Sequence, residues 1–259
     1  MRRSLFGPII IGVIFLAAAG APSSAQTAAP KNEVELNGIY TIPGGEANLS
    51  GTTAAGTTIS FENDFGLKNK LGFGLRYIRR AESGKHKFML NYARTASSNT
   101  RALGRTIVFR DRTYTANLDT RAEESLGVFL ATYAYRWGNQ KVRIGPMAQL
   151  GFATARVDLS AVTNTADAER SGSITKLVGT VGYDMDIHPT DRVNVYNNVG
   201  VFRLKRDRVL RGEVGMKYYL TRAFGVNGGY QFGRYKLVDD PNFIRVNEHG
   251  PLFGAVLRF

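Results

Sequence analysis

Apolar and polar residues alternate along most of this chain, in short segments that are separated by turns. In residues 71–78, for example, the apolar face of the sequence LGFGLRYI holds Leu71, Phe73, Leu75 and Tyr77. A period of two is the spacing of a β-strand with one apolar face. About ten such segments follow residue 33, and most approach the 9–11 residues that a tilted transmembrane strand needs. We therefore predict an all-β fold: a single antiparallel up-and-down transmembrane β-barrel of about ten strands, with eight or twelve as the alternatives.

The connections between these segments are of two kinds. Four are tight turns, around residues 83–85, 138–140, 189–191 and 221–223, and between them lie longer polar stretches at 43–69, 97–124, 161–173 and 238–248. Short turns on one side and long loops on the other are typical of outer-membrane barrels, whose long loops face outward. Two strand-like pieces, 57–61 and 106–110, lie inside the long loops. We expect them to extend neighbouring strands above the membrane; counted as wall strands, they would change the total.

The aromatic residues of the apolar face indicate which solvent that face meets. A soluble barrel turns its apolar side chains inward, whereas a membrane barrel turns them outward, with an aromatic girdle at each interface. Here aliphatic residues lie between two aromatic sets. Near the turn side these are Tyr77, Tyr135, Trp137, Tyr183, Tyr218 and Phe259, and near the loop side Tyr40, Tyr92, Phe152, Phe232 and Phe253. The apolar face is therefore expected to meet lipid.

The first residues have the features of an export signal. Arg2 and Arg3 precede an apolar run from Ile9 to Ala19, and small residues follow up to Ala25. The run is too short for a spanning helix, which needs about 20 residues. We expect a signal peptide at 1–25, a periplasmic lead at 26–32 and the barrel at 33–259, with a retained membrane anchor as the alternative. The expected location is the outer membrane of a Gram-negative cell.

Composition narrows the chemistry. The chain has no cysteine, which removes disulfides and thiolate metal sites, and its three scattered histidines suggest neither a metal site nor a cofactor. The formal net charge of +13 would ordinarily suggest a nucleic-acid partner. For an exported chain, anionic lipid headgroups are the nearer polyanion, so we expect outer-membrane lipid and lipopolysaccharide as partners and no nucleic acid. The oligomeric state stays open.

Several short patterns resemble a large group of small bacterial outer-membrane barrels of unassigned function, within the porin-like and OmpA-barrel-like superfamily. They are GTTISFENDFGL at 56–67, KHKFMLNY at 85–92, TYAY at 132–135 and GPLF at 250–253. The terminal Phe259 also resembles the assembly signal that the barrel assembly machinery reads in such proteins. The resemblance implies fold and location, and it carries no activity.

The inward face near the turn side is unusually charged. It holds Glu35, Lys87, Arg136, Arg143, Asp184, Asp186, Lys217 and Arg258. Charges enclosed by a barrel wall must be paired or hydrated. We expect Glu35 to pair with Arg258 across the closing seam, and Arg143 with Asp184 or Asp186. A salt-bridged plug and a narrow anion- or solute-conducting pore are both compatible with this set, and the plug is the leading interpretation.

Two features of the sequence bear on an enzymatic function. Residues 184–188 (DMDIH) contain Asp-x-Asp and Asp-x-His spacings that resemble the catalytic pairs of omptin proteases. In that family the groups lie at the outer mouth on facing walls, whereas here one run lies at a periplasmic turn. Lipid A deacylases use a His-Ser pair, and only His249 lies high enough, without an identifiable serine. We therefore expect a non-enzymatic barrel with a structural or surface-binding role.

A basic cluster surrounds the short loop at residues 206–208. Its members are Arg203, Lys205, Arg206, Arg208 and Arg211, with Arg234 and Lys236 on the next strand. Lipopolysaccharide phosphates lie at that height, and arginine pairs with phosphate in bidentate fashion. The cluster is a candidate lipopolysaccharide contact, and an ordinary solvated loop tip is the alternative.

Overall fold

The computed structural model describes residues 31–162 and 169–259. The expected signal peptide and all but the end of the expected periplasmic lead lie outside the described residues. Ten long strands form the wall, which confirms the predicted antiparallel ten-stranded barrel. They are β1 Asn32–Asn48, β3 Lys70–Arg80, β4 His86–Ala102, β7 Asp119–Tyr135, β9 Val142–Ala161, β10 Glu169–Thr190, β11 Val193–Leu204, β12 Asp207–Tyr219, β13 Phe224–Asp239 and β14 Asn242–Arg258.

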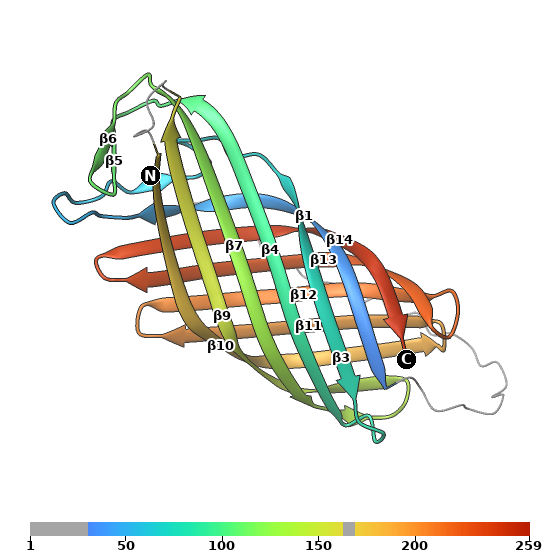
Figure 1. The fold of residues 1–259 in the computed structure, drawn as a ribbon. Helices are drawn as coiled ribbons and strands as arrows, with labels where there is room; N and C mark the ends of the chain where they lie inside the picture. The colour runs from blue at the N-terminus through green and yellow to red at the C-terminus, as the bar shows by residue number, and fades with distance from the viewer. Residues whose placement is uncertain (1–30, 163–168) are drawn as a thin grey trace, which may run out of the picture.

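Each wall strand pairs with its neighbours along the chain, and β14 pairs with β1 to close the barrel (Figure 1). The seam is extended by the terminal residue, since the backbones of Asn32 and Phe259 exchange two hydrogen bonds of 3.0 and 3.1 Å. Phe259 is exposed there, facing outward. A short strand β8, Trp137–Gly138, continues the course of β7 along β9. In the half of the barrel that carries the C-terminus, each wall strand is paired on both sides, which is the condition for a sheet to cross a membrane.

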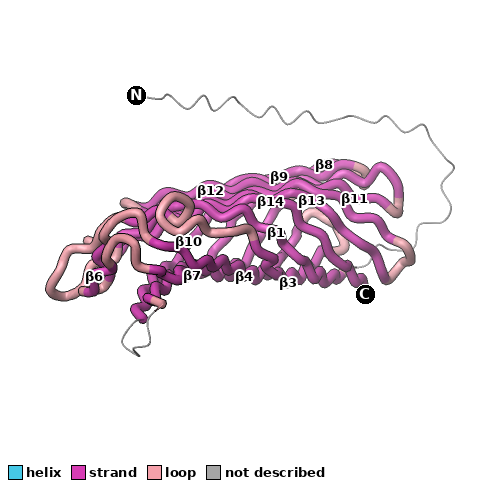
Figure 2. The backbone as a smooth tube through the Cα atoms, turned by 90° about the horizontal axis from the view of Figure 1, so that it is seen from above, coloured by secondary structure: helices cyan, strands magenta, loops and turns pink. Residues whose placement is uncertain are grey.

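The two ends of the barrel differ as the turn pattern predicts. The tight turns gather at the end that carries the C-terminus, and the short strands of the long loops lie at the opposite end (Figures 1 and 2). Those short strands are β2 Ile59–Ser60, β5 Ile107–Phe109 and β6 Arg112–Tyr114. The expectation that both loop pieces extend wall strands is only half right. β2 pairs with β1, whereas β5 and β6 pair only with each other and turn their apolar side chains into a core.

The outward face changes character part-way along each strand, as β9 illustrates. Up to Phe152 its outward residues are apolar: Val142, Ile144, Pro146, Ala148, Leu150 and Phe152. Beyond Phe152 the outward residues are polar: Thr154, Arg156, Asp158 and Ser160. The inward residues change in the opposite sense, to Ala153, Ala155, Val157, Leu159 and Ala161. Pairing continues this border onto the neighbours, since Phe152 lies opposite Phe129 of β7 and Leu177 of β10.

The barrel therefore has two sections. The lower section carries the exposed apolar band with the tight turns and charged interior, and it is the membrane-spanning part. The upper section has a polar exterior and an apolar interior. The long loops contribute Leu49, Phe61, Phe65, Leu103 and Tyr114 to this interior. Along the described residues, no helix has the length and apolar character required for a membrane crossing.

Candidate functional site

One group of buried charges lies where the first and last strands meet. Glu33 of β1 is fully buried and pairs with Lys217 of β12, with Arg80 of β3 at 3.2 Å and with Arg258 of β14 at 3.3 Å. Glu35, two residues further along β1, also pairs with Lys217. Tyr219 donates a hydrogen bond of 3.1 Å to Glu33. Each carboxylate therefore has several donors, as an enclosed charge requires.

A second group lies on the opposite wall. Asp184 and Asp186 of β10 point inward side by side, and Lys87 of β4 contacts them at 2.9 and 3.3 Å. Arg136, which is 1% exposed, pairs with Asp186 and lies 3.4 Å from Asp184. Its Nη2 donates to the carbonyl of Gly84 at 3.2 Å. The two aspartates thus share two cations between them.

Pairs between distant strands show that these groups cross the interior. Arg76 of β3 donates to Glu35 at 3.1 Å and also reaches Glu213 of β12. Three strands, β1, β14 and β13, separate β3 from β12 along the wall. Glu213 accepts a further hydrogen bond of 2.7 Å from Tyr196 of β11. The side chains of opposite walls therefore meet across the lower interior. We call the buried charged side chains that form these ion pairs the lumen network.

The lumen network contains most of the residues that the sequence singles out, and others that it does not. It contains five acidic and six basic side chains, which form two groups of ion pairs. Among them Glu33, Arg76, Arg80 and Glu213 were not predicted. The alternation of the sequence places all four on the inward face. It does not show how far a long side chain reaches across the lumen.

The expected pairings differ from those observed. Arg258 binds Glu33 and not Glu35, because Glu33 is its register partner on β1. The two aspartates bind Lys87 and Arg136 instead of Arg143. Arg143 lies at the turn end of β9, and its Nε donates to the carbonyl of Asn139 at 3.3 Å. Arg143 therefore belongs to the rim on the turn side and not to the described ion pairs of the lumen network.

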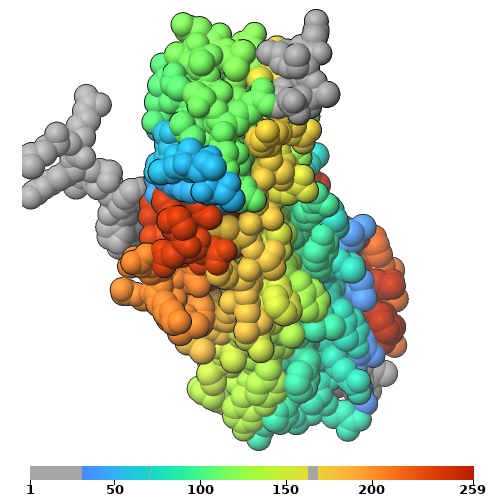
Figure 3. Space-filling model, turned by 60° about the vertical axis from the view of Figure 1, so that its left-hand side comes forward, coloured from blue at the N-terminus to red at the C-terminus, as the bar shows by residue number. Residues whose placement is uncertain are grey.

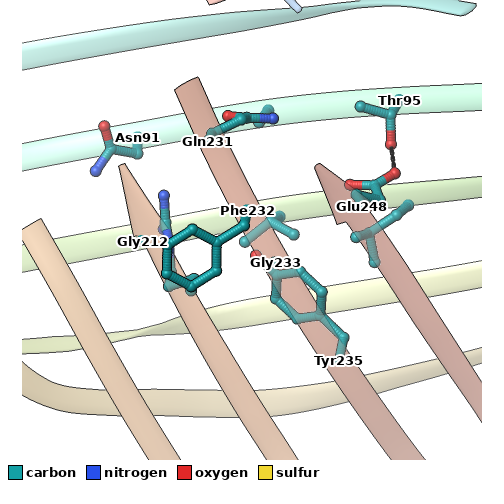
Figure 4. Close-up of a pocket in the computed structure, with 12 residues that line it drawn as sticks. Asn91, Thr95, Gly212, Gln231, Phe232, Gly233, Tyr235 and Glu248 are labelled. Carbon is teal, nitrogen blue, oxygen red and sulfur yellow. Dashed lines mark hydrogen bonds between the residues drawn. The ribbon is translucent and has the colours of Figure 1, made fainter. Parts of the chain in front are cut away.

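Above the lumen network lies a small polar cavity. Its volume is about 40 Å³, room for about three water molecules. Figure 4 shows Thr95 and Glu248 joined on one side of it, with Gln231 and Tyr235 near them. Glu124 lies in the same upper interior at 2% exposure, and its Oε1 has no hydrogen-bond partner among the described residues. This layer separates the charged interior from the apolar one.

The long loops close the outer end over the apolar interior. Figure 3 shows the segment between β4 and β7, in green, at the tip of the molecule, with the segment after β1, in blue, beneath it. One carboxylate joins these two segments. Asp111 accepts hydrogen bonds of 2.6 to 2.9 Å from the backbone amides of Thr52, Thr53 and Ala54, and of 3.0 Å from two threonine hydroxyls. The amide bonds, led by that of Thr53, hold the pKa of Asp111 well below its usual range.

The basic cluster near the β11–β12 turn divides into two parts. Arg203, Lys205, Arg206 and Arg208 are exposed at the outer rim, and Arg206 pairs with Asp240. Arg211 is not part of this surface. It lies two residues before Glu213 on β12, so both side chains are on the inward face, and Arg211 lines the polar cavity. The expectation that Arg211 lies at the outer rim with the other four residues is therefore wrong.

The three histidines have partners of their own. His249 lies on the outward face at the upper border of the apolar band, where its Nδ1 meets the Tyr230 hydroxyl at 2.6 Å. His86 makes the same contact with Tyr133 at 2.8 Å near the turn side. His188 contacts Asn194 at 2.7 Å. Within residues 31–162 and 169–259 no cluster of three or more metal-ligating side chains occurs.

Comparison with known proteins supports the fold and gives no activity. No family model matches the chain, and no curated protein matches it. Among solved structures, it is similar to the outer membrane protease OmpT from Escherichia coli, with 8% identity, 91% of this chain and 99% of that chain covered, and a TM-score of 0.59.

Two further solved structures are similar to a lesser degree. The translocator domain of the autotransporter NalP from Neisseria meningitidis has 14% identity, 88% and 89% coverage and a TM-score of 0.45. Ail, the attachment invasion locus protein of Yersinia pestis, has 13% identity, 88% and 99% coverage and a TM-score of 0.41. The resemblance to small bacterial outer-membrane barrels is confirmed at the level of fold: this chain forms a ten-stranded barrel of the bacterial outer-membrane type.

Proposed function

We propose that this protein is a non-enzymatic integral barrel of the Gram-negative outer membrane, with a closed lumen and a structural or surface-binding role. The lumen network carries the proposal. Ion pairs between β3 and β12, between β1 and β12, and between β4 and β10 join walls that are not neighbours in the sheet. A continuous water path would have to pass between buried, hydrogen-bonded charges, and breaking such a pair is strongly unfavourable.

The upper section adds a second closure. Above the polar cavity, apolar inward residues of β7, β9, β13 and β14 pack against loop residues such as Leu49, Phe61 and Phe109. A tightly packed apolar interior excludes water and ions. Two closures of different chemistry, one ionic and one apolar, support a plugged barrel over an open pore.

The non-enzymatic part of the proposal rests on where the candidate catalytic groups lie. Asp184 and Asp186 are engaged by Lys87 and Arg136 inside the lumen network, at the end opposite the long loops. His249 meets the hydroxyl of a tyrosine, Tyr230, on the outward face. A hydrolase needs a nucleophile with an adjacent base and access to substrate, and these residues do not combine in that way.

Planar bilayer recording tests the closed lumen. The purified barrel, with folding checked by heat-modifiable gel migration, is inserted into a bilayer under a salt gradient, beside a general porin as the positive control. We expect insertion without steady conductance. A steady, anion-preferring conductance that is lost in an Arg136→Gln variant would overturn the plugged lumen and establish the narrow channel instead. An Arg143→Gln variant is the matched control, since its charge lies at the rim.

A further inference from the structure

Four cations lie in one row across the outward face of the upper section. Strand register places Arg203 of β11 opposite Arg208 of β12, Arg208 opposite Lys236 of β13, and Lys236 opposite Arg245 of β14. Neighbouring strands are about 4.8 Å apart, so each cation has a like charge beside it. We call these four residues the cation row.

Like charges directly opposite each other on a sheet are destabilising. Within residues 31–162 and 169–259, the acidic side chains of the same rim compensate only one end of the row, where Arg245 meets Glu46 of β1 at 2.8 Å. The other nearby acids have different partners: Asp240 binds Arg206, and Asp239 binds Lys176 at 2.9 Å. Asp207 accepts the backbone amide of Val238 at 2.7 Å. Among the described residues, Arg203, Arg208 and Lys236 therefore have no carboxylate partner, and Lys236 lies over the ring of Phe243, 5.7 Å from its centroid.

The opposite wall shows what a self-compensated surface looks like in this barrel. On β7, Arg121 lies 3.9 Å from Glu123, and on β9, Arg156 lies 2.9 Å from Asp158. These residues also face outward above the apolar band. Each arginine there has its own carboxylate two residues away. The excess of positive charge is thus a property of the β11–β14 wall.

The height of the row indicates which anion it meets. Register places Phe232 and His249 at the top of the apolar band, Arg234 one outward step above Phe232, and Lys236 one step above Arg234. Four residues of strand span about 13 Å, or about 10 Å of height at the tilt of a membrane barrel. Phospholipid phosphates lie within the headgroup zone, about 5–8 Å thick on each side. Phosphates carried on a sugar headgroup extend further from the acyl chains.

We infer that the cation row binds the phosphate groups of lipopolysaccharide, with the acyl chains of the same lipid lying against the apolar band below. Arginine and lysine would contact the phosphates, and the ring of Phe232 with the His249–Tyr230 pair would contact the upper acyl chains. This inference deepens the surface-binding role proposed above and rests on the outer-membrane location.

Binding of defined lipids to the purified full chain tests the inference. The variant is Arg208→Gln/Lys236→Gln, and the matched control is Arg121→Gln/Arg156→Gln on the opposite wall. Each protein in detergent is mixed with rough lipopolysaccharide that carries core phosphates, and bound lipid is counted by native mass spectrometry. The same measurement is made with enzymatically dephosphorylated lipopolysaccharide and with phosphatidylglycerol.

We expect the wild type and the control pair to retain the phosphorylated lipid about tenfold better than the Arg208→Gln/Lys236→Gln variant, the effect of losing one strong charge-assisted contact. Dephosphorylation should reduce binding to the wild type by a similar factor. Equal retention by both double variants overturns the inference, as does equal binding of the dephosphorylated lipid. Preference for phosphatidylglycerol would also overturn it and assign the row to phospholipid. Unchanged heat-modifiable migration in all samples separates these outcomes from a failure of the barrel fold.

Discussion

Arg258 of the last strand donates through its Nε to the carboxylate of Glu33 on the first strand, 3.3 Å away, at the seam where the barrel closes. The same carboxylate also accepts from Lys217 and from Arg80, which come from two further strands. Within the described part of the chain, Glu33 is thus the one anion to which three cations of the lower interior are joined. Removing it leaves those cations enclosed by the wall with less compensation.

The first prediction follows from this arrangement. Glu33→Ala should lower the free energy of unfolding by about 3–5 kcal/mol, the usual effect of removing one partner of a buried ion pair. The measurement is urea unfolding in lipid vesicles, followed through the fluorescence of Trp137, the only tryptophan of the chain. Glu82→Ala is the control, because Glu82 pairs with Lys31 at an exposed site and such pairs contribute about 0–1 kcal/mol. Equal midpoints for the two variants would contradict a stabilising role of Glu33.

Much of the fold could be predicted because strand alternation and turn length are local properties. The apolar set Leu150 and Phe152, for instance, identifies both the outward face of β9 and the border of its membrane band. What the alternation could not show is that the loop pieces around Ile107 and Tyr114 fold inward. That outcome depends on the apolar interior of the upper section, which several strands build together.

The candidate site was predictable in composition and not in pairing. Alternation places Asp184, Asp186 and Lys87 on the inward face, yet their contacts depend on the diameter of the barrel and on side-chain length. Arg136 follows β7 directly and reaches the two aspartates. Arg143 has the sequence parity of the inward residues of β9, yet its side chain bonds to the turn. Register, which fixes such choices, follows from closure of the whole sheet.

The second prediction tests the border between the two sections. Val181 and Ser173 face outward on β10, below and above Leu177, and both are exposed. Val181→Arg should lower stability in vesicles by about 2–4 kcal/mol, because it places a charge in the middle of the hydrocarbon. Ser173→Arg should change it by less than about 0.5 kcal/mol, as for an ordinary surface site. Similar losses for both variants would mean that the membrane extends above Leu177.

The third prediction concerns Glu124, whose Oε1 lacks a partner in the upper interior. Glu124→Gln should raise the urea midpoint at neutral pH, by about 1 kcal/mol in free energy, because it removes a buried ionisable group that lies near a second carboxyl group, Glu248. Glu123→Gln is the matched control, because Glu123 is the next residue along β7 and its side chain faces outward near Arg121. A loss of stability in Glu124→Gln would show that the carboxylate has an essential partner.

The last prediction concerns the join between the two long loops at Asp111. Amide hydrogen bonds lower its pKa in the folded state, so its contribution to loop docking is complete above the unfolded value of about 3.9 and is lost only as pH falls through the lower folded value. Limited trypsin cleavage at Arg110 and Arg112 should therefore be slow in the wild type. Asp111→Asn should accelerate cleavage several-fold at pH 7. The neutral side chain of asparagine accepts hydrogen bonds from the backbone N–H groups of Thr52 and Thr53 more weakly than a carboxylate does. Docking in the wild type, followed by amide hydrogen exchange in residues 50–56, should stay constant from pH 7 to pH 5. A decline in protection within that range, or unchanged cleavage in Asp111→Asn, would show that other contacts hold the loops together.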